Sequence, residues 1–413
     1  MSKAIFFNVP AYGHINPSLG LVSELVRRGE QVIYYATEEF HANIEGTGAE
    51  FRAYDNIPAD LLEDVNGNPF ILSVRMIDAC ALMLPELLEI VRAENPDYII
   101  YDSMCPWGWQ VAHHLNLPSV SSMGLFATSV NMFIKSGKFP ALFMQAARNF
   151  GLLWKYNRKA AALERMLGVK APSFVESLNS GGDLTLVHTS ATFQPNADSF
   201  PKSYKFVGPS IQERNESVDF PFEWLGIKPL IYISMGTVNN DQLAFYRECL
   251  AAFDENFQVV MSIGNRVEMR DLGAIPENYI VRRYVPQLEL LPAVDLFITH
   301  GGMNSVQEAL YHKVPLIVIP QTMEQSIVGG QVAKLGAGVM LDKAKANRES
   351  LREAAYEVLD NGRYQSGATQ LGESFKAAGG YRRATDEIFA LLHKRVSVAE
   401  RVQSTFTKSI IGA

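Results

Sequence analysis

Short apolar runs alternate along the chain with longer stretches in which apolar residues recur every three to four positions. In the first half, five such runs have the length and composition of strands: residues 4–9, 31–35, 98–101, 184–188 and 204–207. After the first run, Asn16 and Pro17 precede an apolar stripe that ends before Gly29, which predicts a helix with Asn16 as its N-cap. Strands that alternate with helices in this way are typical of a parallel sheet in an α/β fold.

The second half repeats this pattern after a polar stretch. The polar residues 211–219 follow Gly208 and Pro209 and have the composition of a linker. Beyond them, strands are expected at residues 229–234, 259–263, 280–285, 293–299 and 314–319, and helices at 303–311, 351–359 and 386–392. A chain of 413 residues also exceeds the size at which one core stops growing. We therefore predict two domains, residues 1–208 and 223–380, joined by residues 209–222.

Composition and charge exclude several classes of protein. The net charge is −7 and no run of like charge stands out, so nucleic acid is not an expected partner. The three cysteines, Cys80, Cys105 and Cys249, form no CxxC pair, which fits a reducing cytoplasm without disulfides or a zinc site. No apolar segment approaches the ~20 residues that a membrane span needs. Pro10 and Gly13 interrupt the first apolar run before it reaches the length of the apolar region of a signal peptide. A soluble cytoplasmic protein without a membrane partner is expected.

Residues that suit an anionic ligand gather at the end of the strand predicted at 293–299. His300 follows this strand, and Gly301 and Gly302 separate it from the next predicted helix. Glycines let the backbone approach a ligand closely, and the first N–H groups of a helix, with the positive end of its dipole, attract anions. This order predicts a binding site for a pyrophosphate.

Further polar side chains are expected at the same sheet edge. Asn304 and Ser305 are placed to cap the helix and to offer donors, while Glu308 lies one turn beyond Asn304 and suits ribose hydroxyls. Thr237 follows the first strand of this half and suits a phosphate oxygen. The strand at 314–319 leads to three residues that suit sugar hydroxyls: Gln321, Glu324 and Gln325.

A candidate base comes from the first half. His14 lies after the first strand and Asp102 ends the strand at 98–101, so both are expected at the carboxyl edge of a parallel sheet. Asp102 would fix the imidazole tautomer and stabilise the imidazolium as His14 takes a proton. Taken alone, a loop histidine is more often a surface or capping residue, and an aspartate at a strand end is equally a turn residue.

Methionines and aromatic residues are frequent in the irregular apolar stretches of the first half. Flexible methionines and flat rings suit a pocket for apolar ligands, although ordinary helical core has the same composition. As a group they predict a broad acceptor site. The residues expected to line it are Met76, Met104, Trp107, Phe126 and Met132.

The order of these residues resembles the donor signature of family 1 UDP-glycosyltransferases, especially the bacterial macrolide and flavonoid branch. The family motif runs aromatic-x-Pro-Gln, then His-x-Gly-x-Asn-Ser-x-x-Glu, then Pro followed by an acidic-Gln pair. The resemblance covers the whole chain and implies the GT-B fold: two Rossmann-like, doubly wound domains facing across a cleft, with residues 381–413 returning to the first. The motif residues are Tyr284, Pro286, Gln287, His300, Gly302, Asn304, Ser305, Glu308, Pro320, Glu324 and Gln325.

The resemblance also implies a role for each donor residue. Tyr284 would stack on uracil, Gln287 would bond the base edge or the ribose, and Glu308 would bind the ribose. Plant members carry Trp where this chain has Tyr284 and Met303, which leaves the choice between uridine and thymidine diphosphate sugars open. The remaining roles are the diphosphate for His300, Asn304, Ser305 and Thr237, and the sugar for Glu324 and Gln325.

The implied reaction is inverting transfer of a hexose, most simply glucose from UDP-glucose, to hydroxyls of flavonoids, other phenolics or macrolides by a monomer. The resemblance places the catalytic dyad at His14 and Asp102. The chain contains no D-x-D sequence, so we expect no metal and no cofactor. Kinase, dehydrogenase and hydrolase motifs are also absent from the sequence. Two alternatives remain, a nucleotide-sugar epimerase and a non-catalytic nucleotide-sugar sensor.

Overall fold

The structure is a computed structural model that describes residues 2–62, 68–128, 139–212, 219–236 and 240–411. The chain forms two compact units, residues 1–210 with 378–413 (unit 1) and residues 211–377 (unit 2). The sequence-based expectation placed the boundary at residues 209–222, of which residues 213–218 lie outside the described residues. The last helix follows unit 2 in the sequence but belongs to unit 1.

Unit 1 is built on a seven-stranded sheet in the order β3-β2-β1-β4-β5-β6-β7, and all of its strand pairs are parallel. The strands are β1 Lys3–Phe7, β2 Gln31–Ala36, β3 Glu50–Ala53, β4 Tyr98–Asp102, β5 Ser119–Met123, β6 Leu184–Val187 and β7 Tyr204–Phe206. The helices are α1 Tyr12–Arg27, α2 His41–Glu45, α3 Pro69–Glu94, α4 Pro106–His114, α6 Phe139–Arg148, α7 Phe150–Leu167 and α14 Gly380–Ile411.

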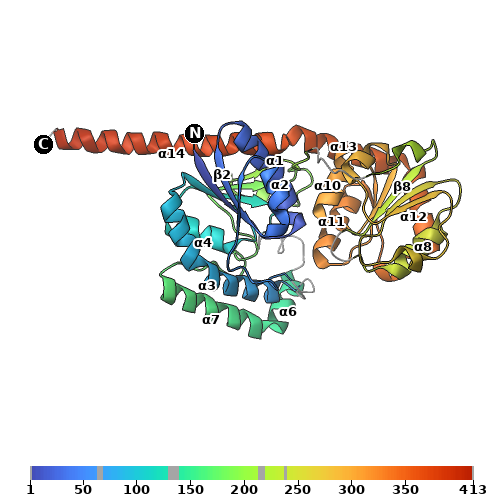
Figure 1. The fold of residues 1–413 in the computed structure, drawn as a ribbon, viewed down its shortest axis with the longest axis horizontal. Coiled ribbons are helices and arrows are strands. Elements are labelled where there is room, and N and C mark those ends of the chain that lie inside the picture. Colours follow the sequence, from blue (N-terminus) through green and yellow to red (C-terminus); the bar gives the residue numbers. More distant parts are fainter. Residues whose placement is uncertain (1, 63–67, 129–138, 213–218, 237–239, 412–413) are drawn as a thin grey trace. The chain divides into compact units, whose positions relative to one another are not determined.

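Helices cover both faces of this sheet because successive strand side chains alternate between the faces. Ile5 and Phe7 of β1 belong to a core that includes residues of α3, α4 and α7. Ala4 and Phe6 belong to a second core that includes residues of α1, α2 and α14. Helices α1 and α14 pack side by side on this second face (Figure 1). Unit 1 is therefore doubly wound, as the sequence predicts.

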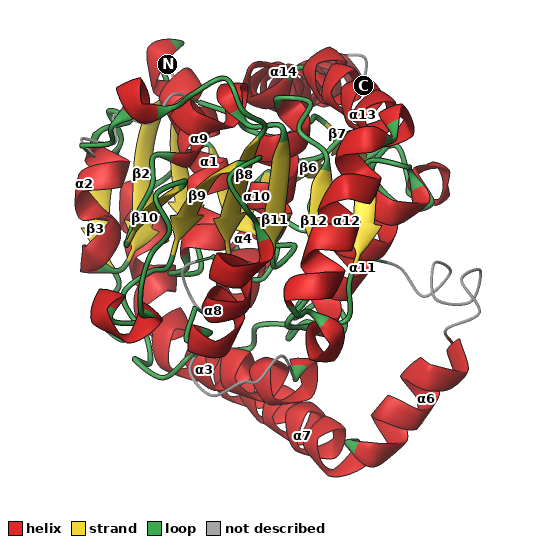
Figure 2. Ribbon diagram, turned by 90° about the vertical axis from the view of Figure 1, so that its right-hand side faces the viewer, coloured by secondary structure: helices red, strands yellow, loops and turns green. Residues whose placement is uncertain are grey.

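Unit 2 repeats the architecture with a six-stranded parallel sheet in the order β10-β9-β8-β11-β12-β13 (Figure 2). Its strands are β8 Leu230–Ser234, β9 Gln258–Ser262, β10 Tyr279–Arg282, β11 Leu296–Thr299, β12 Leu316–Val318 and β13 Gly338–Met340. Its helices are α8 Leu243–Ala252, α9 Gln287–Leu290, α10 Met303–Tyr311, α11 Met323–Lys334, α12 Arg348–Asp360 and α13 Gly362–Ala378.

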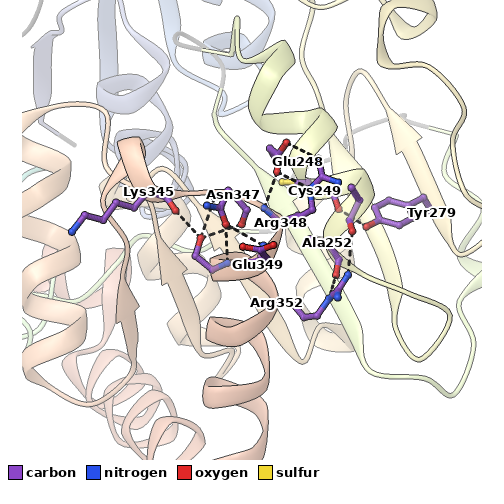
Figure 3. A network of polar contacts seen from close by, with 11 residues as sticks. Glu248, Cys249, Ala252, Tyr279, Lys345, Asn347, Arg348, Glu349 and Arg352 are labelled. Carbon is purple, nitrogen blue, oxygen red and sulfur yellow. Dashed lines mark hydrogen bonds and ion pairs between the residues drawn. The ribbon is translucent and has the colours of Figure 1, made fainter.

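Polar contacts hold two of these helices, α8 and α12, to each other (Figure 3). The backbone N–H of Arg348 donates to Glu248 at 2.8 Å, and the Arg352 guanidinium donates to the Ala252 carbonyl at 2.7 Å. Asn347 caps α12 by accepting from the N–H of Ser350 at 3.0 Å. These contacts join the second half of α8 to the beginning of α12 and involve none of the residues expected to bind a ligand.

Candidate active site

His14 and Asp102 meet at the carboxyl edge of the unit 1 sheet. The distance from His14 Nδ1 to Asp102 Oδ2 is 2.9 Å. Asp102 ends β4 and is 2 % exposed, and its other oxygen accepts from the backbone N–H of Met104 at 2.8 Å. An imidazole that donates from Nδ1 to a carboxylate carries its lone pair on Nε2. The pair therefore has the geometry of an oriented base.

The helix that carries His14 begins earlier than the sequence predicts. Helix α1 begins at Tyr12 with Ala11 as its N-cap, so the expectation of an N-cap at Asn16 is wrong. The backbone N–H groups of His14 and Ile15 both donate to the Ala11 carbonyl at 2.9 Å, which closes the first turn upstream of Asn16. His14 consequently lies in a helical turn rather than in a loop, and its backbone is fixed.

Asn8 supports this turn and was not singled out by sequence reasoning. Its amide donates to the His14 carbonyl at 3.2 Å and to the Tyr34 hydroxyl at 2.6 Å. Ser18 lies 2.6 Å from the same hydroxyl and donates to the Ile15 carbonyl at 2.7 Å. The available signal was one buried asparagine at the end of an otherwise apolar strand, because a buried amide needs hydrogen-bond partners.

A second histidine lies near Asp102 but has a different character. Ser122 of β5 is the register partner of Asp102, and its hydroxyl lies 2.8 Å from His188 Nε2. Burial lowers the pKa of His188 to about 4, against the opposing effect of the Asp102 charge. His188 is therefore neutral at pH 7.

His300 follows β11 and directly precedes the glycines at the N-terminus of α10 in unit 2. Gly301 has a φ of +87°, which favours glycine, and Gly302 is the N-cap of the helix. Burial lowers the pKa of His300 to about 4, and a hydrogen bond with the Ser234 backbone acts in the opposite direction. The imidazole is thus neutral at pH 7 and can offer a phosphate a hydrogen bond but no charge.

The space beside Gly302 is filled by His300 itself. A Cβ atom on Gly302 would lie 2.6 Å from His300 Nε2, and one on Gly236 would lie 2.6 Å from His300 Cε1. From the sequence, we expected the glycines after His300 to let the backbone approach a ligand closely. In the structure, Gly302 and Gly236 leave room for the imidazole ring, which is thereby held at the helix end.

Asn304 and Ser305 are the second and third residues of α10, and both are partly buried. Both lie inside the helix, after its N-cap position, so the expectation that these residues cap the helix is wrong. The cap position belongs to Gly302, one residue before the helix. Asn304 and Ser305 still lie in the first turn, where backbone N–H groups lack an acceptor within the helix.

The residues expected to bind the nucleoside also come together. The Gln287 amide donates to Glu308 Oε2 at 2.6 Å, and the Tyr232 hydroxyl donates to Gln287 Oε1 at 3.3 Å. Glu308 is 3 % exposed, whereas Tyr284, three residues before Gln287, is 47 % exposed. An exposed ring close in sequence to a fixed amide and carboxylate suits a base and a ribose.

The acidic-Gln pair lies at the beginning of α11. Gln325 forms a capping box with Thr322, and its side-chain oxygen accepts from the N–H groups of Gln321 and Thr322 at 2.7 and 3.2 Å. Its oxygen is therefore engaged by the backbone, and a sugar would bind to the amide nitrogen. Glu324 is exposed at the same helix end. Thr237 lies outside the described residues.

Known proteins resemble this chain over most of its length. The family model for the C-terminal domain of erythromycin biosynthesis protein CIII-like proteins matches residues 247–380. The Bacillus subtilis protein YojK, named as an uncharacterized UDP-glucosyltransferase, is 37 % identical, with 97 % of this chain and all of YojK covered. The NDP-glycosyltransferase YjiC of Bacillus subtilis is 35 % identical, with 94 % of this chain and 96 % of YjiC covered.

This chain belongs to the family 1 UDP-glycosyltransferases. Its fold agrees with that assignment. The crystal structure of the glycotransferase of kitacinnamycin has a TM-score of 0.84 and 28 % identity, with 95 % of this chain and 99 % of that chain covered. The expected GT-B architecture of two Rossmann-like domains is therefore confirmed for this glycosyltransferase.

Two of the expected acceptor residues of this glycosyltransferase belong to the core instead. Met76 and Trp107 are both 0 % exposed within the cluster formed by the sheet, α3 and α4. The Trp107 indole donates to the Tyr54 hydroxyl at 3.2 Å, which satisfies its only polar atom inside the protein. The expectation that they line a pocket is wrong, because close packing leaves them no surface for a ligand.

The other three acceptor residues have different positions. Met104 is partly buried beside the same core, and Phe126 is 8 % exposed and packs against Phe193 with the rings tilted and their centroids 5.2 Å apart. Met132 lies outside the described residues. A cavity of about 270 Å³ between β3 and α3 is lined by none of the five expected residues. The acceptor site thus stays a prediction.

Within the described residues, no three His, Cys, Asp or Glu side chains are grouped so that they could hold a metal ion. Among the described helices, none is both long and apolar enough to cross a membrane.

Proposed function

We propose that this glycosyltransferase moves a hexose, most simply glucose, from a UDP-sugar to a hydroxyl of an apolar small molecule. The transfer inverts the configuration at the anomeric carbon. The enzyme would act as a monomer in the cytoplasm. The observation that carries the proposal is the 2.9 Å contact between His14 and the buried Asp102. A nucleotide-sugar sensor has no use for such a base, and an epimerase acts on a single ligand without an acceptor hydroxyl.

In the proposed reaction, His14 Nε2 takes the proton of the acceptor hydroxyl. The acceptor oxygen forms a bond to the anomeric carbon, and the bond from that carbon to the diphosphate oxygen breaks with its electron pair. Asp102 stabilises the imidazolium formed on His14, because the carboxylate already accepts from Nδ1. Since attack comes from the side opposite the leaving group, an α-linked donor gives a β-linked product.

Negative charge develops on the departing diphosphate and needs stabilisation. His300 contributes a hydrogen bond without charge, because its pKa is lowered to about 4 by burial. The N-terminus of α10 contributes backbone N–H groups and the positive end of its dipole. We propose that these groups suffice without a metal ion, so activity should persist in a chelator.

The donor's nucleoside is proposed from the pairing of Gln287 with Glu308. A buried carboxylate held by a side-chain amide suits a ribose with two hydroxyls, which favours uridine over the deoxyribose of thymidine. The name of YojK, a UDP-glucosyltransferase, supports glucose. The name of the matched family, which refers to an erythromycin biosynthesis protein, supports a macrolide among the proposed acceptors, which also include flavonoids and other phenolics.

The test compares purified wild type with His14→Ala in UDP-glucose, a flavonoid phenol and a chelator, following glucoside and UDP by mass spectrometry. Loss of the base is expected to lower turnover about 10²–10⁴-fold. His41→Ala is the matched control, because His41 lies outside the proposed site, with its side chain 42 % exposed, paired with Glu38 and Glu45 and stacked on the Phe51 ring. Conversion of the donor to another sugar would favour an epimerase, and donor binding without any product would favour a sensor.

A further inference from the structure

The outer side of α7 exposes an unusual combination of side chains. This helix runs along α3 on the outside of unit 1 (Figures 1 and 2). Phe150 is 67 % exposed and Trp154 is 56 % exposed, and residues four apart lie on the same side of a helix. Arg158 follows one turn later with its guanidinium 5.0 Å from the Trp154 ring centre. We call Phe150, Trp154, Lys155 and Arg158 the aromatic-basic face.

The core of unit 1 does not require these aromatic rings. The opposite side of α7 supplies Tyr156 and Leu163, which are 1 % and 2 % exposed, to the core that it shares with α3. Met166, at the end of the helix, is also 62 % exposed. Large exposed apolar side chains that gather on one surface indicate a binding partner.

The charge around this face is opposite to that of the protein. Residues 139–168 contain five Lys and Arg and one Glu, a net charge of +4, in a chain whose net charge is −7. Lys159 pairs with Asp78 of α3. Over the described residues, no carboxylate forms an ion pair with Lys155 or Arg158, so their charge is available to an anionic partner.

We propose that the aromatic-basic face docks on an anionic phospholipid surface. The Phe150 and Trp154 rings would enter the headgroup region while Lys155 and Arg158 bind lipid phosphates. Such binding is reversible and peripheral, since it uses one helix side and no spanning segment. It departs from the sequence-based expectation of no membrane partner and does not depend on the proposed reaction. Its use would be access to apolar acceptors dissolved in the bilayer.

The tryptophans allow a direct test with the full chain. Trp107 and Trp109 are buried, and Trp224 is 63 % exposed in unit 2. The variant Trp224→Phe therefore leaves Trp154 as the one tryptophan with a largely exposed ring. Vesicles of phosphatidylglycerol and phosphatidylcholine should shift its emission to shorter wavelength, and brominated lipids should quench it. Vesicles of phosphatidylcholine alone should have little effect.

Sedimentation with the same vesicles separates the contribution of the aromatic rings to vesicle binding from that of the basic side chains. Phe150→Ala with Trp154→Ala should abolish binding, and Lys155→Gln with Arg158→Gln should weaken it about fivefold for each charge removed. High salt should weaken wild-type binding as well. The matched control is Lys343→Gln with Lys345→Gln, which removes two exposed lysines from unit 2 and should leave binding unchanged.

Three results would overturn the proposal. One is the absence of any emission shift or sedimentation at low salt, and another is equal binding to neutral vesicles. The third is a concentration-dependent molecular mass that Phe150→Ala with Trp154→Ala abolishes in a chain that does not bind vesicles. That result would make the face a contact between copies of this chain.

Discussion

At the scale of single residues, the three histidines near strand ends differ because of their surroundings. His14 is partly exposed and contacts a carboxylate, His188 is buried, and His300 is partly buried at the helix end, where desolvation lowers its pKa, like that of His188, to about 4. Sequence position alone does not separate these cases, since all three follow an apolar run. The difference comes from tertiary burial, which makes the charged form of an imidazole costly.

The burial of His188 predicts that the protein loses stability in mild acid. Folding lowers the pKa of His188 from about 6.5 to about 4, so the unfolded state binds the proton more readily between these values. The contribution of His188 to stability is present above pH 6.5, falls as the pH falls, and is gone below pH 4. We expect the free energy of unfolding to fall by roughly 2 kcal/mol between pH 7 and pH 5 through His188.

Urea unfolding of wild type and His188→Gln at pH 7 and pH 5 measures this contribution. The variant is expected to be less stable at pH 7, because it loses the contact with Ser122, but to lose less stability on acidification. Equal losses in the two proteins would show that the native state tolerates the charged imidazole.

At the scale of elements, the sequence pattern predicted the long apolar strands but missed three others, β3, β5 and β13. Strand β5 is fully buried yet has the sequence SVSSM. Its serines satisfy their hydroxyls through distant partners: Ser121 donates to the Ser180 carbonyl at 2.5 Å, and Ser122 contacts His188. Local composition does not reveal such partners. Strands β3 Glu50–Ala53 and β13 Gly338–Met340 are short edge strands whose pattern is too brief to recognise.

The candidate site was predictable where a motif fixes both residue type and order. The contacts of His14 with Asp102 and of Gln287 with Glu308 join residues to which the family resemblance assigns one function. Composition was a weaker guide to the acceptor residues, because methionine and tryptophan suit a core as well as a pocket. Trp107 illustrates this, since its polar atom is satisfied by Tyr54 inside the core.

The beginning of α10 gives a prediction about packing. Gly302→Ala would place a Cβ 2.6 Å from His300 Nε2, so the ring must move away from the helix end. We expect a loss of about 1–3 kcal/mol of stability and a raised KM for the nucleotide sugar. Thermal unfolding and initial-rate kinetics measure the two effects.

Gly330→Ala is the matched control for this substitution. Gly330 lies within α11, and a Cβ atom at this position would have no neighbouring atom within 4 Å. Alanine favours a helix over glycine by about 1 kcal/mol, so this variant should be neutral or slightly stabilised. Equal effects of the two substitutions would contradict the packing of His300 against Gly302.

At the scale of the whole molecule, the chain returns to its first unit after completing the second. Periodicity at residues 386–392 predicts a helix but not its partner, and the family resemblance was needed to assign it to the first domain. In the structure, Ala384 and Ile388 of α14 are fully buried among residues of α1 and the sheet. Ion pairs of Arg28 with Asp386 and of Lys205 with Glu387 support the same contact.

This return predicts that a change near the C-terminus destabilises the first unit. Ile388→Ala removes a fully buried side chain and should cost about 2–5 kcal/mol in unit 1. His393→Ala, which changes an exposed residue of the same helix, should cost little. Hydrogen exchange resolved along the chain should show faster exchange in β1 and α1 and unchanged exchange in β8 and β11. Faster exchange confined to residues 211–377 would contradict the assignment.

In the proposed mechanism, the sugar passes directly to an acceptor hydroxyl that His14 deprotonates. The configuration of the product tests this mechanism. Wild type is incubated with α-linked UDP-glucose and a phenolic acceptor in a chelator, and the anomeric proton of the purified glucoside is examined by NMR. We expect a β-glucoside, with one UDP released per glucoside formed. An α-glucoside, or a product that forms only when a divalent ion is restored, would contradict the proposed mechanism.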